Sequence, residues 1–121
     1  MKLRDKAEAL RMVIDRKVDI LDIEALLGKL SDMVNISGLA AEIAPSAKLE
    51  YRNKQETVIL YLMENPVNLS ASATNELIKA RSAKEESFAE YCELLNKRLS
   101  YGMDALRSII SLRKVEIQNS L

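Results

Sequence analysis

The sequence predicts an all-α fold of three helices, the last of which is much the longest. Glycine and proline make up only 5 of 121 residues, where roughly 12% is usual, so few residues suit the tight turns of a β protein. Apolar residues also recur at helical spacing along most of the chain. The length predicts one domain over 1–121.

A first helical segment is expected over about 2–36. It carries two apolar stripes, at 3–14 and at 20–34, which are out of phase with each other. A bend or break is therefore expected between them, with Asp19 as the N-cap of the second part. Gly38 is expected to end the segment, because glycine readily takes the left-handed conformation of a helix C-cap.

A second helix is expected over 45–64. Pro45 suits its first turn, where the missing N–H would have no helical partner. The helix is expected to end before Pro66, since the residue that precedes a proline is pushed toward an extended conformation. Residues 65–69 are the clearest loop in the sequence.

The third helix is expected over about 71–118, after Ser70 or Ser72 as its N-cap. Its polar residues are spaced by four and three in alternation, which is the pattern of a coiled coil. Nearly fifty residues give a helix on the order of 70 Å long, against roughly 30 Å for the second helix. The long apolar stripe therefore needs a break, for example at Gly102, or cover from another subunit.

We favour the second subunit, because a glycine in a helix interior costs only about 1 kcal/mol and the stripe continues in phase on both sides of it. The chain is accordingly expected to form a dimer or higher homo-oligomer. The predicted oligomer or partner interface consists of Phe88, Leu95, Leu99, Met103, Leu106, Ile109, Ile110 and Ile117.

The charges alternate along the chain although their sum is zero. Residues 1–17 carry a net charge of +3 and residues 18–45 of −4, while 84–96 carry −3 and 97–121 carry +3. This order suits an up-down-up bundle in which the first and third helices run parallel. Antiparallel pairing of two long helices across a dimer satisfies it equally.

Enzymatic chemistry is not expected, and neither is a metal or a cofactor. The chain has no histidine, which removes the commonest general base and transition-metal ligand. The single cysteine, Cys92, falls in the apolar stripe and is expected to be a buried thiol without a base to activate it. One cysteine and no apolar leader favour the cytoplasm, and no stretch is apolar enough to span a membrane.

Nucleic acid is a second class of partner, since basic side chains gather in the last part of the third helix. Such a cluster can contact phosphates. The candidate contacts are Lys97, Arg107, Arg113 and Lys114. Aromatic residues that could stack on bases are few.

Residues 45–118 resemble small all-helical proteins of tailed phages and prophages. The matching elements are Tyr51, the small residues 70–73, Lys79 and the stretch 107–114, whose sequence is Arg-Ser-Ile-Ile-Ser-Leu-Arg-Lys. The resemblance implies a phage or mobile-element origin and an accessory role in DNA metabolism. It assigns no catalytic residue.

The function expected from the sequence is a non-enzymatic, oligomeric helical adaptor that binds a host or phage protein. The alternative is a nucleic-acid-binding accessory factor in DNA replication or recombination, which would use the basic end of the long helix.

Overall fold

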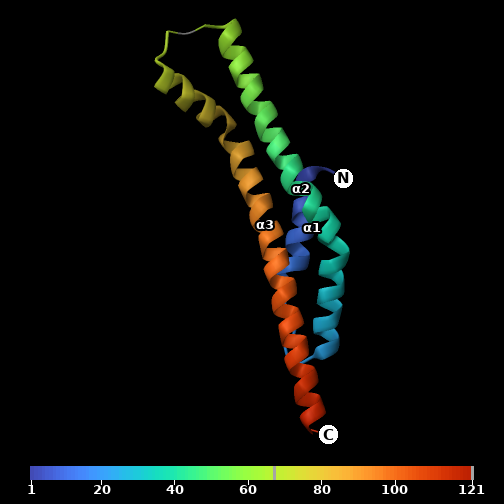
Figure 1. The fold of residues 1–121 in the computed structure, drawn as a ribbon. Helices are drawn as coiled ribbons and strands as arrows, with labels where there is room; N and C mark the ends of the chain where they lie inside the picture. The colour runs from blue at the N-terminus through green and yellow to red at the C-terminus, as the bar shows by residue number, and fades with distance from the viewer. Residues whose placement is uncertain (67, 121) are drawn as a thin grey trace.

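The computed structural model describes residues 1–66 and 68–120 as three α-helices: α1 (Leu3–Asp15), α2 (Ile23–Glu64) and α3 (Ala71–Ser120). Val67, within the predicted loop, and Leu121 lie outside the described residues. Figure 1 shows α2 and α3 as a long antiparallel hairpin with α1 beside its middle part. The predicted all-α class and the long C-terminal helix are confirmed.

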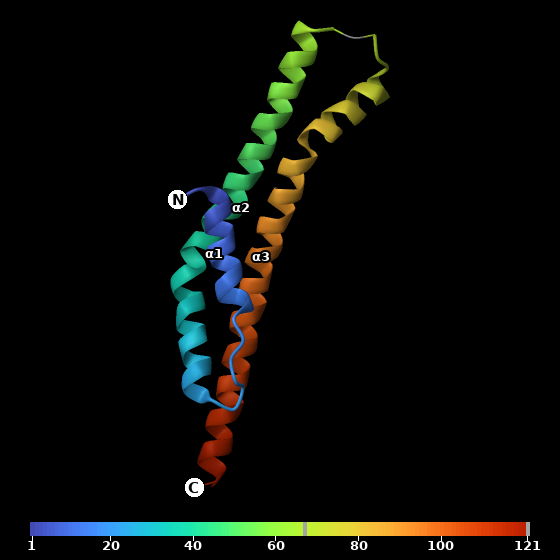
Figure 2. The same cartoon turned by 180° about the vertical axis from the view of Figure 1, so that it is seen from behind.

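α1 runs parallel to α3, which is one of the two arrangements that the charge pattern suited. Residues 23–36, expected in the same first segment, instead belong to α2, which runs antiparallel to α3 (Figure 1). The Arg4 guanidinium lies 4.4 Å from the centroid of the Phe88 ring, near the start of α1. At its other end, Asp15 pairs with Arg98. From the first contact to the second, the residue numbers increase along both helices, so the two helices point in the same direction. Figure 2 shows the same arrangement from behind.

The helical structure is interrupted between α1 and α2, where the two apolar stripes fall out of phase. The carboxylate of Asp22 accepts hydrogen bonds from the backbone N–H groups of Glu24 and Ala25, both at 3.1 Å, and so caps α2. Asp19, the predicted cap, instead accepts the N–H of Leu21 at 2.9 Å in a local turn. The break is confirmed, and the cap lies three residues later than predicted.

α2 continues for 42 residues, so the predicted stop at Gly38 and start at Pro45 are wrong. Gly38 does not have a positive φ angle, and Pro45 lies on the exposed side of the helix. The proline costs about 3 kcal/mol in a helix interior. Continuity outweighs this cost because it keeps one apolar stripe in phase for burial. The buried residues of that stripe are Leu26, Met33, Ala40, Ile43, Ala44, Ala47 and Val58.

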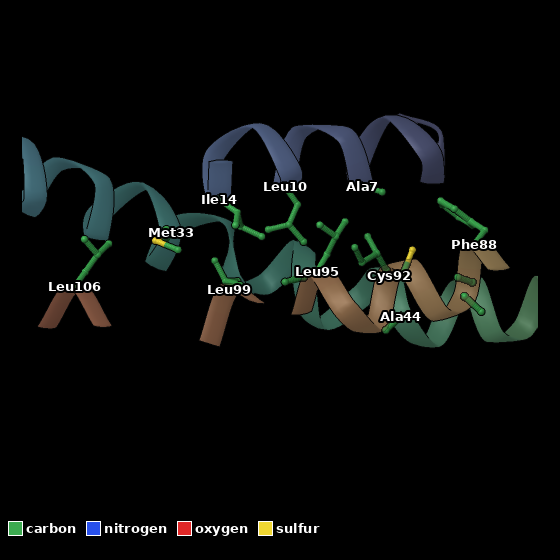
Figure 3. Close-up of a cluster of buried hydrophobic side chains, with 14 of the residues drawn as sticks. Ala7, Leu10, Ile14, Met33, Ala44, Phe88, Cys92, Leu95, Leu99 and Leu106 are labelled. Atoms are coloured by element: carbon green, nitrogen blue, oxygen red, sulfur yellow. The ribbon is translucent and has the colours of Figure 1, made fainter. Parts of the chain in front are cut away.

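The extra length of α2 gives α3 its cover. With 42 and 50 residues, the two helices are about 63 Å and 75 Å long. Figure 3 shows the resulting core, where Leu10 and Ile14 of α1 meet Leu95 and Leu99 of α3. One apolar core therefore runs from Leu26 to Ala47 of α2 and from Phe88 to Ile110 of α3.

Gly102 marks a close approach of α2 and α3 rather than a helix break. A Cβ atom built on Gly102 would lie 2.7 Å from the terminal methyl carbon of Met33. The helix passes through this glycine without interruption, so the alternative of a break here is wrong.

Candidate protein-interaction surface

The predicted oligomer interface is mostly the core of a single chain. Phe88, Leu95, Leu99, Leu106 and Ile110 are buried. Two further members of the predicted set, at positions 103 and 109, are half-buried against the same core. The premise that these residues lack cover is wrong, because it assumed a second helix of about twenty residues.

Ile117 is the one member of the predicted interface that stays exposed, at 48% of its surface. It lies near the end of α3, where Figure 1 shows the helix extending beyond the start of α2.

The predicted nucleic-acid contacts do not form one surface. Arg113 donates from Nε to the carbonyl of Ile20 at 3.2 Å and pairs with Glu116 at 2.7 Å. Arg107 and Lys114 are exposed and lie seven residues apart, on one helix face. Lys97 is ten residues before Arg107, so it points to a different side of α3.

Cys92 is buried in the core, and two nearby acidic side chains of α3, Glu86 and Glu93, bind side chains of α2. Cys92 is fully buried, as predicted, and burial raises the pKa of its thiol. Glu86 accepts a hydrogen bond from the Tyr51 hydroxyl at 3.2 Å. Glu93 pairs with Lys48, and that hydrogen bond lowers the pKa of the Glu93 carboxyl. Within 1–66 and 68–120, no three histidine, cysteine or acidic side chains gather as a metal-ligand group.

The end of the α2–α3 hairpin has no third helix against it. α1 accompanies α3 only from about Phe88 to Arg98, and Figure 1 shows the hairpin continuing well beyond the start of α1. Large apolar side chains are exposed at this end. They are Ile59, Leu60, Tyr61, Met63 and Leu69.

A groove of about 240 Å³ lies between α2 and α3 in this uncovered part. Apolar and basic side chains line it, and no acidic one does. The lining residues are Lys54, Thr57, Val58, Tyr61, Leu62, Leu77 and Arg81. We call this hollow the tip groove.

The tip groove continues the seat that α1 occupies lower down. Thr57 follows Glu50 by seven residues, and Glu50 borders a hollow with the first residues of α1. Arg81 precedes Phe88 by seven residues, and Phe88 lies beneath Arg4 of α1. Seven residues are two helical turns, so both helices turn the same face to α1 and to the tip groove.

A second exposed apolar stripe follows the outer side of α3. Leu94, Tyr101, Leu112 and Val115 are each about half exposed or more. Leu94 and Tyr101 are seven residues apart and Leu112 and Val115 are three apart, which is heptad spacing.

The sequence reading missed the tip groove, although one signal pointed to it. The apolar stripe of the second helix continues to Val58 and Leu62, beyond the part of the hairpin that a helix as short as α1 covers. That signal can be interpreted only once the start of α1 is known to lie beside Phe88, short of the end of the hairpin (Figure 1).

Comparisons with known proteins add nothing to the fold described above. No family model, no curated protein and no solved structure matches the chain. The resemblance to small phage proteins therefore stays a prediction. No helix of the described residues combines the length and the apolar character needed to cross a membrane.

Proposed function

We propose that this chain is a non-enzymatic protein-interaction module that binds another protein at the uncovered end of its helical hairpin. One observation carries the proposal: the α2–α3 pair extends past α1 and exposes large apolar side chains there. Several large apolar side chains exposed near an apolar groove are typical of a site that binds another protein. The host or phage identity of the partner stays a prediction.

Capture of the partner tests this proposal with matched variants. The chain carrying Tyr61→Ser and Met63→Ser at the tip is compared with one carrying Met12→Ser and Leu21→Ser, all four side chains being strongly exposed. We expect the tip variant to lose a protein that the wild type retains from an extract of the source cells, while the control variant keeps it. Equal retention by both variants would contradict a binding site at the tip.

Self-association is a separate part of the proposal. We assign its interface to the second exposed apolar stripe, on the outer side of α3, because most of the residues predicted first lie in the core. An antiparallel second copy would set residues 84–96, of net charge −3, against residues 97–121, of net charge +3. Sedimentation at micromolar concentration tests it. We expect a dimer that Tyr101→Glu with Leu112→Glu dissociates, and a monomeric wild type would refute it.

Nucleic-acid binding ranks second, since only Arg107 and Lys114 keep an exposed common face. Their change to glutamate should abolish any salt-sensitive shift of DNA in a gel. A shift that survives this change would show that other residues contact the DNA.

A further inference from the structure

We propose that the tip groove binds an acidic amphipathic helix of a partner protein, in the position that α1 would take if it were longer. This inference rests on the proposed function and names the chemistry of its partner. It depends on three features of the groove: the face it uses, its length and its charge.

The face of the groove is already shaped for a helix. α1 seats Ala7, Leu10 and Ile14 on the hairpin, and all three are buried. The tip groove presents the same faces of α2 and α3 two turns further on. Leu62 and Leu77 are only half-buried there, so apolar side chains of a partner would remove their remaining surface from water.

The length of the uncovered part of α2 suits a helix of the size of α1. α2 extends from residue 52 to Glu64 past the start of α1, which is about 20 Å of helix. The 13 residues of α1 also span about 20 Å. A partner helix of three to four turns would therefore fill the uncovered part.

The charge of the groove selects an acidic partner. Lys54 and Arg81 line it, and neither forms a salt bridge with any described residue. Arg4 and Lys84 line a neighbouring hollow beside Phe88, again without an acidic side chain. Carboxylates along the edges of a partner helix would meet these cations, and lysines there would be repelled.

The acidic residues of the hairpin end point elsewhere. Glu56 and Glu64 are exposed on α2, and neither lines the groove. Glu50 lies four residues before Lys54 on the same helix face, but it forms no salt bridge with Lys54 in the described structure. Glu76 on α3 directly precedes Leu77 and is displaced from it by about 100° around the helix. The positive charge of the groove is therefore not neutralised from within the chain.

Binding of synthetic peptides to the full chain tests the proposal. The probe is a labelled 13-residue helical peptide with leucines at the spacing of Ala7, Leu10 and Ile14 and glutamates on both flanks of that face. A second peptide replaces every glutamate with lysine. A third keeps the composition of the first but alternates its leucines, so that it has no apolar helical face.

We expect the glutamate peptide to bind about tenfold or more tightly than the lysine peptide at low salt, as two or more charge pairs of modest strength predict. The alternating peptide should not bind. Lys54→Glu with Arg81→Glu should invert the preference between the first two peptides. Lys97→Glu with Lys114→Glu, which changes two exposed cations far from the groove, should leave it unchanged.

Two results would overturn the inference. One is equal binding of the glutamate and lysine peptides, and the other is a preference that Lys54→Glu with Arg81→Glu does not alter. Circular dichroism checks that the variants remain helical. If the peptides fail to bind while partner capture still depends on Tyr61 and Met63, the proposed function stands and only the acidic-helix partner is refuted.

Discussion

Replacement of Pro45 by alanine should stabilise the protein, because α2 passes through this residue without interruption. Residue 45 of a continuous helix would donate its N–H to the carbonyl of Ala41. Proline has no N–H, and its ring crowds that carbonyl. Alanine restores the hydrogen bond and removes the crowding.

The size of the effect follows from where Pro45 lies. A proline in a helix interior is about 3 kcal/mol less favourable than alanine, which sets the upper limit. Pro45 is exposed, so alanine loses no core contact. Ala41 is exposed as well, so water already satisfies part of its carbonyl. We expect the free energy of unfolding to rise by about 1–3 kcal/mol.

Urea unfolding followed by circular dichroism measures this change. For a slope of about 1.5–2 kcal/mol per M, the midpoint should move up by about 0.5–2 M with the slope unchanged. Pro66→Ala is the control, because Pro66 lies outside the helices. A stability that stays constant or falls in Pro45→Ala would refute the reasoning, since it would mean that a separate helix begins at this proline.

Three further predictions concern the helix interior, the core and the buried thiol. Gly38→Ala should raise the free energy of unfolding by about 1 kcal/mol, because an added Cβ meets no atom within 4 Å; a loss in urea unfolding would indicate a left-handed helix end. Leu95→Ala should cost about 2–5 kcal/mol, while Leu49→Ala should change stability by less than about 0.5 kcal/mol, since the first side chain is 0% and the second 57% exposed; similar values for both would contradict the core. Burial raises the pKa of the Cys92 thiol above its ordinary 9.0, so the stabilisation by the buried thiol is complete below that pH and is lost as pH rises through the folded pKa. The stability of wild type relative to Cys92→Ala should therefore fall as pH rises above 9.0, and parallel curves would contradict this.

The sequence predicted the end of the second helix and the limits of the third better than it predicted the interior of α2. The third helix was expected over 71–118 and spans Ala71–Ser120. The second was expected to end at residue 64 and ends at Glu64. Both limits are set by local chemistry: a proline that bars the helix and a serine that caps the next one, the Ser70 Oγ accepting the N–H of Ala73 at 3.1 Å.

The interior of α2 could not be predicted from the same local signals. Gly38 and Pro45 each oppose a helix, by about 1 and 3 kcal/mol. Neither local penalty includes the apolar surface that a continuous helix buries against α1 and α3. That surface depends on which helices become neighbours, which no local pattern states.

The sequence by itself determined that the chain is helical, where its last helix lies and that Cys92 is buried. These follow from periodicity and capping, which act over a few turns. The charge order suited parallel first and third helices and an antiparallel dimer equally, and the structure shows α1 parallel to α3 (Figure 1). Only the tertiary structure decided that the long apolar stripe of α3 is covered within the chain. It also decided that α1, which starts beside Phe88, leaves the far end of the hairpin open (Figure 1). The physical reason is that burial is a property of helix pairs: one continuous α2 covers α3, and one short α1 exposes the tip groove.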